Sequence, residues 1–354
     1  MFLVVDCGTS FLKAALAQEN ALITEDPVRF ALPDPDHPQC WTSALEKAIS
    51  FFGKDRISCI ALTGNGPAAV AVTKDGEAPV AVLWNSSGQN PSDPSFLPRI
   101  KALKDNYPSV YSKAGCILGS SEYLAWFLTK KACRATPVEG FEKFYNLDNS
   151  VDSTLIPPFI KSGEVLGKYG EIPVLVPWPD FVPAIIGSGA VHPGMLCLRT
   201  GTGDGINLCT DKPVQMEGFL TARHPNGVDW NLSCIVPSTG EEIAKAVGKG
   251  NWNEAASDSS FTRIAETAFS RSADAIKKLS KIMPVKEIRI SGGLSDNAVL
   301  NGIRARVTGR KMATTQSKET GLQGLAILAF CAINNADIKS TTDALVRVKE
   351  TYLP

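Results

Sequence analysis

Short hydrophobic runs alternate with amphipathic segments along both halves of the chain. Apolar runs bounded by turn residues predict buried strands, whereas apolar positions spaced three and four residues apart predict helices. Predicted strands lie at 2–6, 13–18, 57–63, 68–73, 78–84, 194–200, 204–209, 228–236 and 287–291. Predicted helices lie at 41–52, 97–111, 120–130, 240–247, 259–282, 296–309 and 319–334, with a loop at 86–96 and an irregular stretch at 132–170. Strands that alternate with helices in each half indicate the α/β class.

Two polar turns stand at equivalent places in the two halves. "DCGTS" (6–10) and "TGTGDG" (200–205) each lie between two apolar strands, which makes a weak internal repeat. Glycine lets backbone N–H groups turn toward an anion, and the carboxylate of Asp6 can hold a hydrated Mg²⁺. Two such hairpins can grip a triphosphate from both sides, and the chain has no GxxxxGK[ST] loop. For the first turn alone, a plain hairpin is the alternative, since Asp-x-Gly-Thr also occurs in aspartic proteases.

The composition is that of an ordinary globular protein without net charge. The 354 residues suffice for two domains, and 36 basic residues balance 36 acidic ones, which argues against non-specific nucleic-acid binding. No apolar run reaches membrane-spanning length, and the N-terminal "MFLVVDCGTS" lacks the basic region of a signal peptide. We therefore expect a cytoplasmic protein that binds neither nucleic acid nor membranes.

The cysteines and histidines do not suggest a metal centre. The nine cysteines form no CxxC pair and mostly lie in apolar runs, so we expect buried, reduced thiols rather than a zinc or redox site. The three histidines, His37, His192 and His224, are scattered along the chain and each precedes a proline. This spacing argues against a metal site built on them.

Five segments, in the same order, resemble the FGGY-type carbohydrate kinases, in the superfamily that includes hexokinases, actin and the heat-shock ATPases. "VVDCGTSFLKAAL" resembles the first phosphate motif of that family, and "LRTGTGDGINL" resembles the second. "RISGGLSDNAVLNGIRARVTGRKM" is similar to the adenosine segment, and "ETGLQGLAILAF" to the helix that follows it. A fifth segment, 172–194, follows the family pattern without a gap. The chain is shorter than is usual for the family, and most of the missing length falls between Trp84 and the helix predicted to begin at 97.

The resemblance implies an α/β fold of two actin-like ATPase (ribonuclease H-like) domains, 1–187 and 188–354, with a nucleotide cleft between them. It implies ATP and Mg²⁺ as cofactors, with Asp6 as the metal ligand, and it allows a homodimer. The implied reaction is ATP-dependent phosphorylation of a hydroxyl group of a small-molecule sugar or polyol, as in xylulose kinases. The nucleotide-binding positions of the family fall on Gly8, Thr9, Ser10, Lys13, Gly201, Thr202, Gly203, Gly292, Gly293 and Asn297.

The catalytic aspartate of the family falls on Asp180. A carboxylate there can accept the proton of a sugar hydroxyl as that hydroxyl attacks the γ-phosphate. Pro177, Trp178 and Pro179 stand where the family has flexible glycines, which predicts a stiffer loop with fewer N–H donors. An aspartate before an apolar run can also cap a helix, here 181–190, and the two roles are compatible.

The acceptor side departs from the family pattern. Ser86 and Gly88 stand where the family has an aspartate and an arginine, and Pro67 replaces another polar group. Each lost charged hydrogen bond costs on the order of 1.5–3 kcal/mol, so we expect poor activity on familiar sugars. The resemblance still assigns substrate binding to Asn65, Trp84 and Asn85.

Other interpretations of the sequence stay open. The same replacements favour a nucleotide-binding pseudokinase with a regulatory or structural role. A different ATPase of the superfamily, such as an activase with a cluster between subunits, would need paired cysteines near a glycine-rich loop, and the sequence has none. Asp204, just after the second turn, could help to hold Mg²⁺, could repel phosphate, or could be a solvated turn residue.

Overall fold

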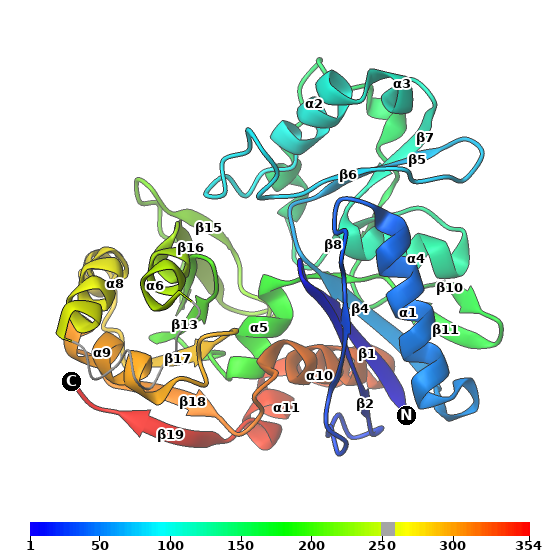
Figure 1. The fold of residues 1–354 in the computed structure, drawn as a ribbon. Helices are drawn as coiled ribbons and strands as arrows, with labels where there is room; N and C mark the ends of the chain where they lie inside the picture. The colour runs from blue at the N-terminus through cyan, green and yellow to red at the C-terminus, as the bar shows by residue number, and fades with distance from the viewer. Residues whose placement is uncertain (249–258) are drawn as a thin grey trace. The chain divides into compact units, whose positions relative to one another are not determined.

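The computed structural model describes residues 1–248 and 259–354, which form two compact units (Figure 1). Unit 1 contains Met1–Pro183 and Leu325–Ala336, and unit 2 contains Ala184–Gly324 and Asp337–Pro354. The chain passes from one unit to the other inside α5 (Phe181–Ser188) and α10 (Thr320–Asn334). The functional division into 1–187 and 188–354 stays a prediction.

A mixed sheet forms the centre of unit 1, with strands in the order β10-β11-β4-β1-β2-β3 and β12 beside β4. The helices α1 and α4 pack against it and against each other (Figure 1). Trp41 and Leu45 of α1 lie one turn apart on its buried face, as the apolar spacing predicts. The bounds are β1 Phe2–Cys7, β2 Phe11–Ala17, β3 Val28–Ala31, α1 Pro38–Phe52, η1 Lys54–Arg56, β4 Cys59–Gly64, α4 Ser120–Thr129, β10 Val165–Tyr169, β11 Ile172–Leu175 and β12 Trp178–Pro179.

A smaller sheet, β6-β5-β7, and a strand pair, β8-β9, complete unit 1. The single helix predicted at 97–111 is wrong, because the chain breaks at Tyr107 before Pro108, and a residue before proline disfavours helical backbone. The irregular stretch predicted at 132–170 is also partly wrong, since it contains short strands and 3-10 turns. The bounds are β5 Ala69–Thr73, β6 Ala81–Val82, α2 Leu97–Asn106, α3 Pro108–Tyr111, β7 Ala114–Leu118, β8 Arg134–Thr136, η2 Phe141–Tyr145, η3 Ser153–Leu155 and β9 Phe159–Lys161.

Unit 2 has a second mixed sheet, with strands in the order β15-β16-β14-β13-β17-β18-β19. Its centre repeats that of unit 1: the first strand of each hairpin, β1 or β13, pairs antiparallel with the next strand and parallel with a third. This arrangement confirms the internal repeat. The bounds are β13 Met195–Thr200, β14 Asp204–Thr210, β15 Leu220–Arg223, β16 Trp230–Val236, α6 Thr239–Val247, α8 Ser259–Ser280, β17 Glu287–Ser291, α9 Ala298–Thr308, β18 Met312–Thr315, α11 Ile338–Leu345 and β19 Val348–Tyr352.

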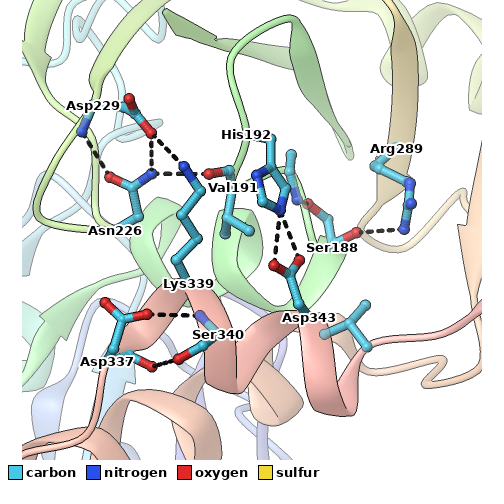
Figure 2. Close-up of polar contacts among 12 residues, drawn as sticks. Ser188, Val191, His192, Asn226, Asp229, Arg289, Asp337, Lys339, Ser340 and Asp343 are labelled. Atoms are coloured by element: carbon cyan, nitrogen blue, oxygen red, sulfur yellow. Dashed lines mark hydrogen bonds and ion pairs between the residues drawn. The ribbon is translucent and has the colours of Figure 1, made fainter. Parts of the chain in front are cut away.

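Polar contacts fasten α11 to the rest of unit 2 (Figure 2). The ring Nε2 of His192 lies 2.8 and 2.9 Å from the two carboxylate oxygens of Asp343. Lys339 Nζ lies 3.2 Å from Asp229 Oδ2, and the same oxygen accepts a 2.8 Å hydrogen bond from Asn226 Nδ2. The His192 ring therefore contacts the carboxylate of Asp343 on α11 directly. No described helix is long and apolar enough to cross a membrane.

Candidate functional site

Three neighbouring parallel strands of unit 1 end at one edge of its sheet. In the pairing register, Asp6 of β1 and Trp178 of β12 both lie opposite Thr63 of β4. Beyond this line β1 leads into the turn at 8–10, and β12 leads directly to Asp180. Ligand sites in open α/β sheets typically form at such carboxyl ends of parallel strands. The predicted metal ligand near the end of β1 and the predicted general base directly after β12 thus lie at the same edge of the sheet.

The turn that follows β4 contacts the predicted first phosphate turn, at 8–10. The side-chain amide of Asn65 donates two hydrogen bonds of 3.1 Å, to the carbonyl oxygens of Cys7 and Gly8. Trp84 Nε1 lies 3.4 Å from the hydroxyl oxygen of Thr9, so the predicted acceptor loop also reaches this turn. Lys13 lies directly opposite Asp6 in the β1–β2 pair, which puts an ammonium group near the same turn.

The proline-rich segment before Asp180 forms part of the sheet edge. Trp178 and Pro179 pair with β4, and the carbonyl oxygen of Trp178 accepts a 2.7 Å hydrogen bond from the hydroxyl of Thr63. The segment is therefore fixed, as the prolines predict, and α5 begins at Phe181, as predicted from the apolar run. Asp180 itself is partly exposed.

A buried arginine that the sequence analysis missed organises the loop after Trp84. Arg99 of α2 is fully buried, and its guanidinium donates hydrogen bonds to the carbonyl oxygens of Trp84, Asn90 and Ser95, at 3.1, 2.9 and 3.2 Å. An arginine on the inner face of a predicted helix is the signal that could have revealed it, because a buried guanidinium needs several acceptors.

The two substituted positions of this loop have local structural roles. Ser86 Oγ accepts a 2.8 Å hydrogen bond from the backbone N–H of Leu83, which closes a turn. Gly88 has a φ of +80°, a left-handed conformation in which a side chain is strained. Asn85 is exposed at this turn. Of the predicted acceptor ligands, Asn65 lines a small pocket of unit 1, whereas Trp84 and Asn85 do not.

In unit 2 the turn at 201–203, the predicted second phosphate turn, lies beside the glycine turn of the predicted adenosine segment. The hydroxyl of Thr200 donates a 2.9 Å hydrogen bond to the carbonyl oxygen of Ser291, at the ends of the parallel strands β13 and β17. Gly292 has a φ of +93°, and a Cβ there would lie 2.2 Å from the carbonyl oxygen of Thr200. Only glycine fits this approach, which brings Gly292 and Gly293 next to the turn at 201–203.

Helix termini flank both turns of unit 2. The carbonyl oxygen of Thr202 accepts hydrogen bonds from the N–H groups of Gly240 and Glu241 in the first turn of α6, at 3.0 and 3.1 Å. The side-chain oxygen of Asn297 accepts a 3.0 Å hydrogen bond from the N–H of Leu300 and so caps α9. The side-chain amide nitrogen of Asn297 takes no part in this cap.

Asp204 is not the solvated turn residue that the sequence allowed. It is fully buried at the start of β14, where its Oδ2 accepts a 2.7 Å hydrogen bond from the hydroxyl of Ser272 on α8. Burial lowers the pKa of the Arg304 guanidinium to about 10, and the charge of Asp204 acts in the opposite direction. Arg304 Nη1 lies 3.4 Å from Asn301 Oδ1, and Asn301 donates a 2.7 Å bond to the carbonyl oxygen of Ser295. Asp204 therefore belongs to a buried polar network behind the two turns, rather than to their surface.

The predicted free thiols are found in the structure. All nine cysteines are free and six of them are buried. Within 1–248 and 259–354, no three His, Cys, Asp or Glu side chains gather as a metal-ligand set.

Comparison with known proteins links this chain to carbohydrate kinases. Residues 254–333 match the C-terminal domain of the FGGY family of carbohydrate kinases. The chain is 26% identical over 275 residues to a xylulose kinase of Lactococcus lactis subsp. lactis (strain IL1403). That match covers 61% of this chain and 54% of the relative, so the chain spans about half of the relative's length.

Solved sugar kinases have the same fold. The ligand-bound xylulose kinase from Lactobacillus acidophilus has a TM-score of 0.78 at 14% identity, over 100% of this chain and 94% of that one. The Plasmodium falciparum glycerol kinase with ADP has a TM-score of 0.78 at 15% identity, with the same two coverages. These similarities confirm the predicted α/β fold of two actin-like ATPase domains. Residues 254–333 therefore match the C-terminal domain of the FGGY family of carbohydrate kinases, and the whole chain shares the fold of the solved sugar kinases.

Proposed function

We propose that the protein catalyses the ATP-dependent phosphorylation of a hydroxyl group of a small sugar or polyol, with Asp180 as the general base. The observation that carries this proposal is the common edge of β1, β4 and β12 in unit 1. Asp6 lies near the end of β1, Asn65 directly after β4 and Asp180 directly after β12, so one sheet edge would hold a metal ligand, an acceptor contact and a base.

In the proposed reaction the acceptor oxygen forms a bond to the γ-phosphorus of ATP. The bond between that phosphorus and the β,γ-bridging oxygen breaks, ADP leaves, and the hydroxyl proton passes to a carboxylate oxygen of Asp180. The hydrogen bond from Thr63 to the carbonyl of Trp178 supports this role, because it restrains the backbone two residues before the base.

Each unit contains proposed nucleotide-binding residues. Within unit 1 they are the turn at 8–10 and Lys13, and within unit 2 they are the turn at 201–203 with Gly292, Gly293 and Asn297. The residues of these turns are partly or fully exposed, which supports the assignment, since their polar groups can reach phosphate oxygens. The N–H groups of Gly8 and Gly201 are the exceptions, because they donate to the carbonyl oxygens of Phe11 and Gly203 within the turns.

Asp6 is the residue that would hold Mg²⁺. It is partly exposed at the carboxyl end of β1, and Mg²⁺ prefers one or two carboxylates together with water and substrate phosphate oxygens, so the residues fit this ion. When bound, the ion would neutralise charge on the phosphate oxygens. The names of the related xylulose and glycerol kinases support the reaction class and the nucleotide.

The first test is nucleotide binding. MgATP at a hundredfold excess over its dissociation constant should raise the free energy of unfolding by about 2.7 kcal/mol. Asp6→Asn should weaken binding with Mg²⁺ more than binding without it. Absence of both calorimetric heat and thermal shift at millimolar MgATP would contradict the proposal. Transfer of labelled γ-phosphate to an added alcohol then tests the reaction itself.

A further inference from the structure

A small pocket of unit 1 lies beside Pro179, the residue before Asp180. The turn at 64–66 and the first turn of α4 form one side of it. The aromatic side chains of Phe96, Phe141 and Tyr145 form much of the other. Phe141 is also stacked on Phe181, with ring centroids 6.0 Å apart, so the aromatic wall continues to the residue after Asp180. Both sequence neighbours of the proposed base thus contact the pocket or its wall: Pro179 lines the pocket, and Phe181 stacks on Phe141.

The carboxylate in the pocket lining is already fully engaged. Glu122 Oε2 accepts hydrogen bonds from Gly119 N at 2.6 Å and from Arg134 Nη1 at 2.7 Å. Its Oε1 accepts from Ala135 N at 2.7 Å and from the hydroxyl of Tyr145 at 3.1 Å. A carboxylate has about four acceptor positions, so Glu122 has no capacity left for a ligand hydroxyl.

The positive charge next to the pocket is also matched. The guanidinium of Arg134 is fully buried, pairs with Glu122, and lies 4.7 and 4.2 Å from the ring centroids of Phe96 and Tyr145. Phe96 and Tyr145 are stacked on each other, and the guanidinium lies against this ring pair rather than in the pocket, whose lining does not include Arg134. A cation that is buried, paired with a carboxylate and absent from the lining is not available to an anionic ligand. An acidic acceptor would therefore meet no counter-charge from this pair.

The side-chain N–H groups of Asn65 are also engaged in bonds within the protein. Both amide hydrogens are directed to the carbonyl oxygens of Cys7 and Gly8, and the backbone carbonyl of Asn65 accepts a 2.5 Å hydrogen bond from the hydroxyl of Ser120. Asn65 Oδ1 is buried without a hydrogen-bond partner among the described residues. The side chains that could read several sugar hydroxyls are thus mostly committed to holding the protein together.

We infer, on the basis of the proposed kinase function, that the pocket selects a small, neutral acceptor with few hydroxyl groups, such as a deoxy sugar or a short diol. The carbon skeleton of this acceptor packs against Phe96, Phe141 and Tyr145. Asn65 Oδ1 can accept a hydrogen bond from one ligand hydroxyl, but each further hydroxyl that enters the pocket loses water without gaining a partner, which lowers affinity by about tenfold to a hundredfold. A sugar acid is disfavoured further by its charge.

Matched ligand pairs test this inference. The pairs are 2-deoxy-D-ribose with D-ribose, and propane-1,2-diol with glycerol, and gluconate is the charged comparison. Calorimetry is performed on the full chain with Mg²⁺ and a non-hydrolysable ATP analogue, and phosphoryl transfer is measured separately. We expect the deoxy member of each pair to bind at least about tenfold more tightly. Equal or tighter binding of the parent polyol, or no binding of either deoxy member, overturns the inference.

The two readouts separate this inference from the proposed function. Tight binding of the deoxy members without any phosphoryl transfer would contradict the kinase reaction and support the pocket. Transfer to parent and deoxy members at the same kcat/KM would support the kinase and overturn the pocket inference.

A pair of variants provides a matched control. Ala68 lines the pocket and its neighbour Ala69 does not, and both are 1% exposed. Ala68→Ser adds a hydroxyl to the pocket wall and should reduce the preference for the deoxy member several-fold. Ala69→Ser adds the same group elsewhere and should leave the preference unchanged. Melting curves show whether each variant is folded, and equal preferences in both variants would count against the inference.

Discussion

The hydroxyl of Thr63 donates a 2.7 Å hydrogen bond to the carbonyl oxygen of Trp178, inside the sheet of unit 1. The two residues also face each other in the parallel pairing of β4 with β12. This bond ties the segment that leads to Asp180 to β4, the strand that adjoins β1. The position of the proposed base therefore depends on the side chain of Thr63, which also lies opposite Asp6 in the β1–β4 pairing.

Thr63→Val should test this dependence. Valine keeps the shape but leaves a buried carbonyl oxygen without its partner, which costs about 1–3 kcal/mol of unfolding free energy. We expect kcat to fall more than the KM for ATP rises, because the phosphate turn follows a different strand. Thr63→Ser keeps the donor and is the control. A KM effect without a kcat effect would show that the bond does not position the base.

Asp180→Asn separates catalysis from helix capping. Asparagine keeps the size of the side chain and caps helices almost as well, but it cannot accept the proton. If Asp180 is the general base, phosphoryl transfer should fall by about 10²–10⁴, while nucleotide affinity and melting temperature barely change. Equal rates would end the catalytic assignment, and a large fall in melting temperature would indicate a structural carboxylate instead. Activity of neither form with any acceptor would favour a pseudokinase.

The sequence predicted those elements whose pattern is local. The hairpins at 8–10 and 201–203 and the helix α1 follow from apolar spacing and turn residues alone. The strand β8 could not be predicted in this way, because three residues carry no period and Arg134 pairs with Phe159, 25 positions away. The pocket beside Pro179, proposed to hold the acceptor, was missed for the same reason, since its aromatic wall comes partly from η2 in the stretch expected to be irregular.

Asp204 shows a second limit of prediction from sequence. Its neighbours "GTG" and Gly205 are turn residues, so a solvated carboxylate was a reasonable expectation. The partners that bury it, Ser272 and Arg304, lie 68 and 100 positions further on, in helices whose packing no local pattern reveals. Long-range polar networks of this kind are visible only once the fold is known.

Substitutions in this network should destabilise unit 2 to different extents. Asp204→Asn removes a buried charge and leaves that of Arg304 uncompensated, which typically costs about 3–5 kcal/mol. Ser272→Ala removes one hydrogen bond to the carboxylate and should cost about 1–3 kcal/mol. Urea unfolding of both variants measures the difference. An Asp204→Asn variant as stable as the parent protein would show that the carboxylate is not held by Arg304.

The stability of unit 2 should also depend on pH through His224. Burial lowers the pKa of this imidazole to about 4 from 6.5, an effect that the nearby Asp229 partly opposes. The unfolded chain therefore binds more protons than the folded one between these two values. Stability is complete above about pH 6.5 and falls as the pH decreases toward 4, by about 1.4 kcal/mol for each pH unit.

Urea unfolding midpoints at pH 7, 6 and 5 measure this slope, and His224→Gln is the variant to compare. Glutamine does not titrate, so the part of the slope that belongs to His224 should disappear even if the variant is less stable overall. Carboxylates elsewhere titrate mostly below pH 5 and contribute little between pH 7 and 5.5. A parent protein and a variant with the same slope in that interval would show that His224 is protonated in the folded state, contrary to the burial that the structure gives it.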